Sequence, residues 1–308
     1  MLPTPEPLKK MEKLIDRWRD PKSAKDADNT RKQILELLEN DAYKNMGESA
    51  NQNYILRNRV FATAHKLRTF RDNPFFAYLA YEQEIVIEEE KEAFVIGQAV
   101  DDLLTDKKGF EKKYEIVARR GESEKIQLTN TQGKIVLAAG EEFRSRHFFP
   151  KKIEKHNVVF MLQGKIPCKM ELDTIDFKRK AFGDIKTCAS IETFDPQRWG
   201  YDFIMSFYQM GIKELYGELF AGELYVVDKS TDGSRSDCYV FRQETLSQFH
   251  EEINNLVKRY IQCQLSGVWP FTLDLNGSIE DRRKFFRSPF YSHESCRQFK
   301  DKMLPLQI

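Results

Sequence analysis

AFGDIKTCAS, residues 181–190, sets an aspartate and a lysine two positions apart in a short apolar stretch. If this stretch is a β-strand, Asp184 and Lys186 emerge on the same face of its sheet. Acid-x-base triplets are common in so charged a chain, because 48 acidic and 49 basic residues give roughly seven or eight by chance. The triplet therefore indicates either an exposed ion pair or one half of a metal site, depending on what surrounds it.

A second aspartate precedes the triplet at a distance that suits a hairpin. Asp173 ends the run MELD, and the polar segment DFKRK, residues 176–180, separates it from AFGD. Two antiparallel strands joined by that turn would place Asp173 and Asp184 side by side. Adjacent carboxylates repel each other, so such a pair usually persists because a proton or a divalent cation lies between them. Oxygen ligands of this kind favour Mg²⁺ or Mn²⁺.

A third oxygen ligand is predicted on an earlier helix. In AFVIGQAVDDLL, residues 93–104, Gly97 and Asp101 are four apart and share one helical face. An acid in an otherwise apolar helix is costly unless it is compensated, and the glycine would let a neighbouring element approach closely. The alternative is that Asp101 lies on an exposed strip and that Asp184 and Lys186 form a surface pair of almost no energetic value.

The bulk composition leaves the partner open. The 308 residues carry a net charge of only +1, so a nucleic-acid surface would have to be a local patch. Five scattered cysteines without a CxxC spacing fit a reducing cytosol and give no support to a structural zinc or iron–sulfur site. No apolar run approaches the length of a membrane span. We expect a cytoplasmic protein, in a bacterial or phage-infected cell, without a membrane partner.

The order of apolar runs predicts an α/β (mixed α+β) fold with a central mixed sheet flanked by helices. We predict a helical N-terminal extension at 1–60, a core at 61–272 and a loop-rich tail at 273–308. The core would carry an inserted hairpin region near 106–157, with Thr131-Gln132-Gly133 as the hairpin turn. Strands are expected at 158–164, 169–175, 181–187, 224–228 and 237–242, and helices at 8–18, 30–38, 93–104, 139–146, 199–216 and 245–265.

These motifs, taken in order, resemble a known enzyme group. Gly-x-x-x-acid on a helix is followed by GKIPCKMELD, then GDIKT, then GYDFIMSFYQMG. The order resembles the PD-(D/E)XK nuclease superfamily, with its restriction-endonuclease-like core. Within it, the chain is most similar to the RecE/lambda-exonuclease-like branch of phage recombination exonucleases, over about residues 65–272. LRTFRDNPFFAYLAY, before the first motif, and SGVWP, at 266–270, resemble the same branch.

The resemblance implies roles for particular residues. Asp173, Asp184 and Lys186 match the catalytic set, in which the two acids bind Mg²⁺ (or Mn²⁺) and the lysine assists an attacking water. Asp101 and the backbone carbonyl of Ile185 would complete the metal ligands, although relatives often carry histidine at the position of Asp101. Thr187 and Tyr208 match positions that contact DNA.

The helical Q-x-x-x-Y motif of the family is only half present. Tyr208 matches its tyrosine, but Ile204 occupies the glutamine position. Gln209 lies next to Tyr208 and points about 100° away on a helix, so it cannot simply substitute. Tyr208 fits a core aromatic residue equally well.

The function implied is a Mg²⁺-dependent exonuclease that degrades linear double-stranded DNA from its ends in phage-type DNA recombination or repair. A single-strand annealing protein and a ring-shaped homo-oligomer are the partners that the resemblance suggests. Two alternatives stay open: a defence-type or single-strand-specific endonuclease on the same fold, and an inactive DNA- or protein-binding module. Phosphate contacts would come from a pool of basic runs at 112–113, 119–120, 144–146, 151–155 and 282–284.

Overall fold

The computed structural model describes residues 5–46, 53, 56–82, 92–150, 153, 155–162, 166–230 and 234–269. The chain divides into two compact units. The first comprises residues 1–90, 164–167 and 254–308, and the second comprises 91–163 and 168–253. The predicted tail at 273–308 lies outside the described residues, and the predicted domain boundaries stay a prediction.

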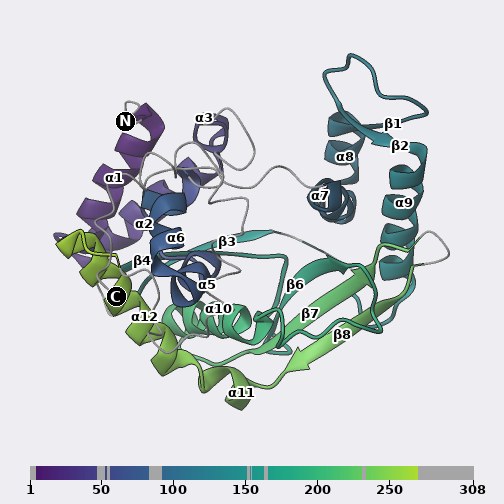
Figure 1. Ribbon diagram of the computed structural model, residues 1–308. Helices are drawn as coiled ribbons and strands as arrows, with labels where there is room; N and C mark the ends of the chain where they lie inside the picture. Colours follow the sequence, from purple (N-terminus) through teal and green to yellow (C-terminus); the bar gives the residue numbers. More distant parts are fainter. Residues whose placement is uncertain are drawn as a thin grey trace, which may run out of the picture. The chain divides into compact units, whose positions relative to one another are not determined.

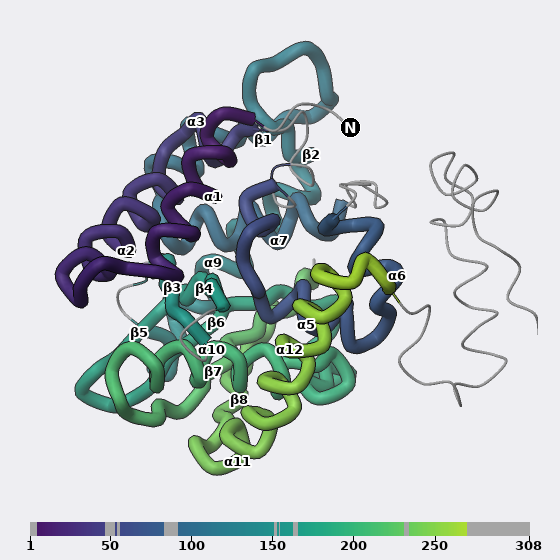
Figure 2. The backbone as a smooth tube through the Cα atoms, turned by 90° about the vertical axis from the view of Figure 1, so that its left-hand side faces the viewer, coloured from purple at the N-terminus to yellow at the C-terminus, as the bar shows by residue number. Residues whose placement is uncertain are grey.

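The first unit begins with two amphipathic helices, α1 (Glu6–Arg19) and α2 (Ala24–Leu38), which lie side by side (Figure 1, Figure 2). Their apolar residues recur at helical spacing, and Ser23 caps α2 by accepting a hydrogen bond from the amide of Asp26. Both helices were predicted from this periodicity. The other helical segments of the unit are α3 (Asp41–Lys44), α5 (Ala64–Asp72), α6 (Pro74–Ala77), the π-helix η1 (Tyr78–Glu82) and, from Asn254 onward, α12 (His250–Ser266).

A buried lysine lies inside the first unit. The Lys66 side chain is only 2% exposed, and its ammonium donates a hydrogen bond to the carbonyl of Arg59 at 3.0 Å. The Glu82 carboxylate lies 3.5 Å from this ammonium and also accepts hydrogen bonds from Tyr260 and, at 3.1 Å, from Gln264. One carboxylate therefore compensates the buried charge and ties η1 to α12.

The second unit opens with α7 (Glu92–Thr105), α8 (Lys107–Lys113), β1 (Tyr114–Val117), β2 (Ile126–Thr129) and α9 (Asn130–Ser145). The predicted hairpin with a Thr131-Gln132-Gly133 turn is wrong, because these residues form the first turn of α9 and β1 pairs with β2 in parallel. Thr129 accepts a hydrogen bond from the amide of Gln132, and the Gln132 side chain accepts one from the amide of Thr129 at 2.7 Å. This capping box starts a helix where the Gln-Gly pair suggested a turn.

The centre of the second unit is a four-stranded mixed sheet in the order β5 (Thr174–Asp176), β6 (Ala181–Cys188), β7 (Ala221–Asp228) and β8 (Ser236–Phe241). Figure 1 shows β6, β7 and β8 side by side. β6 and β7 are parallel, and the other two pairings are antiparallel. The helix α10 (Tyr201–Tyr216) makes the crossover that a parallel pair requires. The predicted mixed sheet flanked by helices is confirmed. β3 (His156–Leu162) pairs with β4 (Ile166–Leu172), and α11 (Gln243–Ser247) follows β8.

Helices cover both faces of this sheet. Ile185 and Tyr225 pack in one apolar cluster with Val100 of α7 and Val136 of α9. On the opposite face, Phe182 packs edge-on against Tyr208 of α10 at 6.4 Å between ring centroids. Because side chains alternate along a strand, Asp184 and Lys186 emerge on the α10 face, as Phe182 does. Within the described residues, every helix is too short or too polar to span a lipid bilayer.

Candidate active site

Asp173 lies at a bend where the chain leaves β4 and enters β5. β5 pairs only with residues 181–183 of β6, with Thr174 opposite Gly183, so Asp173 stands opposite Asp184 at the end of the ladder. The Asp173 amide donates to the carbonyl of Gly183 at 3.1 Å, and its Oδ2 accepts from the amide of Ile185 at 2.7 Å. The ladder between β5 and β6 ends at Gly183, so the Asp173 carboxylate accepts the hydrogen bond of the Ile185 amide in place of a strand carbonyl. The hairpin that brings the two acids together is present as predicted.

Asp184 and Lys186 form a close pair in a mostly buried position. The Lys186 ammonium lies 2.7 Å from Oδ2 of Asp184, and the two side chains are 29% and 5% exposed. The contact lacks the angles of a hydrogen bond, so among the described residues Oδ2 has no hydrogen-bond donor. The pair is therefore not an ordinary exposed ion pair, because the Asp184 carboxylate is almost fully buried.

The electrostatics of the site follow from this burial. Burial, and after it the negative charge of Asp184, raise the pKa of Asp173 to about 8. Burial alone would lower the pKa of Lys186, but the charges of Asp184 and Asp173 hold it well above its ordinary value. Near neutral pH, Asp173 therefore holds a proton in place of a cation, while Lys186 stays charged.

Asp101 comes to the same neighbourhood from α7. Its Oδ2 accepts a hydrogen bond from Lys155, and its Oδ1 is buried with no hydrogen-bond partner among the described residues. Burial raises the pKa of Asp101, and its charge acts in turn on the pKa of Asp173. A Cβ placed on Gly97 would lie 3.0 Å from Oγ1 of Thr187, so the glycine lets α7 approach β6 closely.

The donor set suits a hard divalent cation, although the acids are not fully assembled around one point. Among the described residues, no group of three or more His, Cys, Asp or Glu side chains is arranged to hold a metal ion. Asp101 Oδ1 and Asp184 Oδ2 are nevertheless buried oxygens without hydrogen-bond donors, and lysines lie on both carboxylates. Carboxylate and carbonyl oxygens are the ligands that Mg²⁺ and Mn²⁺ prefer. Asp173, Asp184 and the carbonyl of Ile185 would hold the ion, with Asp101 completing the set.

The predicted DNA-contact residues lie close to this site on two elements. Thr187 follows Lys186 on β6, and Tyr208 is buried in α10, where its phenol acts on the pKa of Lys186 as a lesser influence. Ile204 is fully buried. Gln209 is buried as well, and its side-chain amide donates to the carbonyls of Phe220 at 2.7 Å and Gln243 at 3.2 Å. Gln209 therefore connects α10 to its neighbours and does not replace the missing glutamine.

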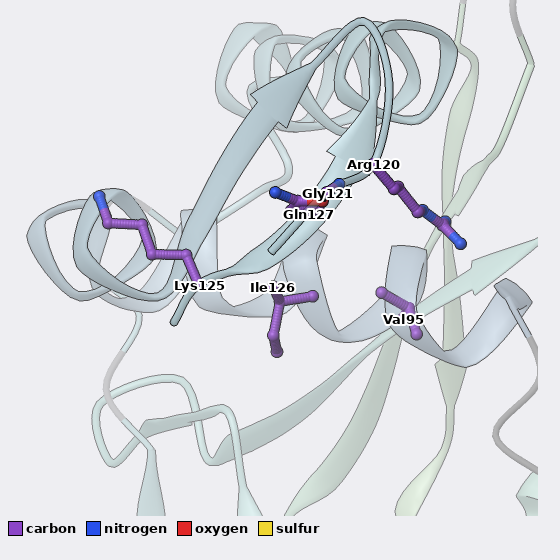
Figure 3. Close-up of a pocket in the computed structure, with 6 residues that line it drawn as sticks. All are labelled: Val95, Arg120, Gly121, Lys125, Ile126 and Gln127. Carbon is purple, nitrogen blue, oxygen red and sulfur yellow. Dashed lines mark hydrogen bonds between the residues drawn. The ribbon is translucent and has the colours of Figure 1, made fainter. Parts of the chain in front are cut away.

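A separate cavity of about 320 Å³ lies beside the β1–β2 pair. It is lined by Val95, Arg120, Gly121, Lys125, Ile126 and Gln127, none of which is a carboxylate. Figure 3 shows the long basic side chains of this set pointing in opposite directions, so they do not converge on one anion. The aspartate cluster, and not this cavity, is the candidate active site.

Comparison with known proteins supports this choice. Residues 65–279 match the family described as a PDDEXK-like domain of unknown function (DUF3799). The fold is similar to the crystal structure of a protein described as "Putative exonuclease" from Eubacterium rectale, with a TM-score of 0.60 and 15% identity over 85% of this chain and 96% of that chain. No curated protein matches the sequence.

The family match and the geometry of the site agree. The matched region contains Asp173, Asp184 and Lys186, and it supports a nuclease with the restriction-endonuclease-like fold. PDDEXK nucleases generally use divalent metals, in keeping with the oxygen donors described above. This chain is therefore a member of the PDDEXK-like DUF3799 family, within the PD-(D/E)XK superfamily.

Proposed function

We propose that this protein is a Mg²⁺- or Mn²⁺-dependent deoxyribonuclease that degrades linear double-stranded DNA from its ends. The observation that carries the proposal is the arrangement of Asp173, Asp184 and Lys186 where β5 leaves β6. Two buried carboxylates stand opposite each other there, and a lysine lies on the same strand face as one of them. Burial and the neighbouring charge of Asp184 raise the pKa of Asp173, and strongly shifted carboxylates of this kind cluster at functional sites.

Each side chain has a distinct part in the proposed reaction. A bound divalent ion would polarise the scissile phosphate and lower the pKa of a coordinated water. Asp173 and Asp184 hold that ion, and the hydrogen bond from the Ile185 amide fixes the Asp173 carboxylate for the purpose. Lys186 orients the attacking water and stabilises the negative charge that builds on the phosphate oxygens. No covalent nucleophile is required.

The preference for duplex ends and a role in phage-type recombination or repair rest on the resemblance to the recombination exonuclease branch. The Eubacterium rectale neighbour is described as an exonuclease and shares the fold, which is in keeping with the proposal. Thr187 and Tyr208 are the residues next to Lys186 that we propose to contact DNA. A single-strand annealing protein and a homo-oligomer are proposed partners.

The first experiment compares three DNA substrates. End-labelled linear duplex, covalently closed circular duplex and single-stranded DNA are incubated with Mg²⁺, with Mn²⁺ or with EDTA. Loss of the linear duplex alone, and only with metal, is the expected result, and the labelled end reports the polarity of digestion. Cutting of the circle would favour the endonuclease instead. A protein that binds DNA without cleaving any substrate would be a binding module.

Variants of the same hairpin connect the activity to the site. Asp184→Asn and Lys186→Met should each lower the cleavage rate by about a thousandfold or more, because each removes charge at the reacting phosphate. Lys178→Met is the matched control, since Lys178 belongs to the other acid-x-lysine triplet of the hairpin, Asp176-Phe177-Lys178. Wild-type rates in either site variant, with folding verified by circular dichroism, would refute the assignment.

A further inference from the structure

Lys155 lies between two carboxylates at the edge of the candidate site. Its ammonium donates a hydrogen bond to Oδ2 of Asp101 and lies 3.8 Å from Oε1 of Glu171. Its side chain is 33% exposed, against 25% for Asp101 and 49% for Glu171. Burial would lower the pKa of Lys155, but the charges of Asp101 and Glu171 hold it above its ordinary value. Lys155 therefore keeps its positive charge while it contacts Asp101, one of the predicted metal ligands.

An ammonium group and a divalent cation that bind the same carboxylate repel each other, which weakens the binding of both. Like charges a few ångströms apart repel strongly where water is partly excluded. Asp101 Oδ1 meanwhile is buried without a hydrogen-bond donor, although Oδ2 of the same carboxylate is occupied by the lysine. In the present arrangement, Lys155 therefore occupies Oδ2 of Asp101, and Oδ1 is left for a different cation.

We propose that Lys155 is an internal counterion that competes with the divalent metal for Asp101, and that it moves to Glu171 when the metal binds. The inference rests on the proposed function, because it concerns the same metal site. Glu171 already lies near the lysine and is more exposed than Asp101, so only a short side-chain movement is needed. The exchange gives Asp101 Oδ1 a partner and leaves the Lys155 ammonium with a carboxylate in both states.

This exchange makes metal affinity depend on residues that do not bind the metal. Lys155 lowers the affinity by occupying Asp101, and Glu171 restores part of it by receiving the displaced lysine. A neutral residue at position 155 should therefore tighten metal binding. A neutral residue at position 171 should weaken it, and only while Lys155 is present.

The test measures Mn²⁺ binding by isothermal titration calorimetry on the full-length protein, without DNA. Lys155→Gln is expected to bind Mn²⁺ about tenfold more tightly than the wild type, because one positive charge leaves the site. The matched control is Lys113→Gln. Lys113 lies 2.7 Å from Asp102, the neighbour of Asp101 on α7, with a comparably exposed side chain. Lys113→Gln should change the Mn²⁺ affinity by less than about twofold, because an exposed ion pair contributes little free energy.

A double-mutant cycle isolates the second carboxylate. Glu171→Gln should weaken Mn²⁺ binding about threefold in the wild-type background and leave it unchanged when combined with Lys155→Gln. Weaker or unaltered binding by Lys155→Gln, relative to Lys113→Gln, would overturn the competition. An equal effect of Glu171→Gln in both backgrounds would show that Glu171 acts through long-range charge and does not receive the lysine.

The same titrations separate this inference from the proposed function. Wild-type protein should bind Mn²⁺, and Asp184→Asn should bind it much more weakly. If the wild type binds no more tightly than Asp184→Asn, the metal site itself is wrong and both proposals fall. If the wild type binds as expected and Lys155→Gln matches the control, only the competition by Lys155 falls.

Discussion

A carboxylate removed from water holds a proton unless a cation replaces it, and Asp173 is the residue where this balance is most visible. Its side chain is buried, its Oδ2 accepts from the amide of Ile185, and Asp184 stands opposite it. The proton that Asp173 holds near neutral pH occupies the place of a positive charge. At the residue scale, the candidate site is therefore a proton site, which the proposed divalent ion would convert into a metal site.

This proton makes the stability of the protein depend on pH. The pKa of Asp173 is about 8 in the folded chain and near 3.9 in an unfolded one, so the unfolded state loses the proton first as pH rises. In EDTA, the free energy of unfolding should therefore fall between pH 5 and pH 8, by roughly 2–4 kcal/mol from this group. Asp173→Asn keeps an acceptor for the Ile185 amide and has no proton to lose, so it should remove this part of the pH dependence.

Urea denaturation at pH 5 and pH 8 measures the difference. Asp176→Asn is the control, because Asp176 lies at the other end of the same strand, β5, and is only half-buried. It should show the pH dependence of the wild type. An unaltered pH dependence in Asp173→Asn would contradict the raised pKa.

The acids come from different elements, and α7 approaches β6 closely where Gly97 meets Thr187. An alanine at position 97 gains up to about 1 kcal/mol of helix propensity, but its Cβ would lie 3.0 Å from Thr187 Oγ1. We expect Gly97→Ala to be neutral or destabilising by about 1 kcal/mol, and Thr187→Ala to relieve it. The coupling energy between the two changes should be about 0.5–1.5 kcal/mol.

A double-mutant cycle in the free energy of unfolding measures that coupling. Gly121→Ala serves as the control, because a Cβ placed there has nothing within 4 Å. Its effect should simply add to that of Thr187→Ala. Additive effects of Gly97→Ala and Thr187→Ala would mean that the close approach of α7 to β6 is not what the glycine provides.

The buried lysine of the first unit predicts an asymmetry between two neutralising changes. Glu82→Gln leaves the Lys66 ammonium, only 2% exposed, without a negative charge, and should destabilise by roughly 3 kcal/mol. Lys66→Met leaves Glu82, which is 22% exposed and still accepts from Tyr260 and Gln264, and should cost about 1 kcal/mol or less. Equal losses in urea denaturation would show that the ion pair is not the source of the difference.

The sequence predicts these elements unevenly, for physical reasons. Asp173, Asp184 and the hairpin between them follow from strand alternation and a polar turn, which are local patterns. The capping box at Thr129 and Gln132 is also local, yet it competes with a turn signal from the Gln-Gly pair, which predicts a hairpin where the structure has a helix. Lys155 could be assigned only to a basic run, because its contact with Asp101 spans 54 positions of sequence.

At the scale of the whole molecule, the residues of the candidate site and the helices α1 and α2 belong to different compact units. Asp101, Asp173, Asp184 and Lys186 all belong to the second unit, whereas α1 and α2 belong to the first. A ligand that binds a folded unit stabilises that unit against opening. Metal binding should therefore act unequally on the two units.

Hydrogen exchange measured residue by residue can detect this inequality. At a metal concentration one hundred times Kd, exchange that requires opening of the second unit should slow by about a hundredfold in β6 and β7. Exchange in α1 and α2 should stay within about twofold. Asp184→Asn should abolish the slowing, and equal slowing in both units would mean that the chain opens as one cooperative body.

The amide of Ile185 that holds the Asp173 carboxylate has a consequence for the order of events in a cell. Because this amide and a proton compensate Asp173, and a lysine lies against each of Asp101 and Asp184, the chain can complete its folding before it meets any metal. Small zinc domains behave differently, since they fold only when they are loaded. A newly synthesised chain would thus reach its final shape inert, and loading would follow as a separate, reversible event. Chelation should silence such an enzyme without unfolding it.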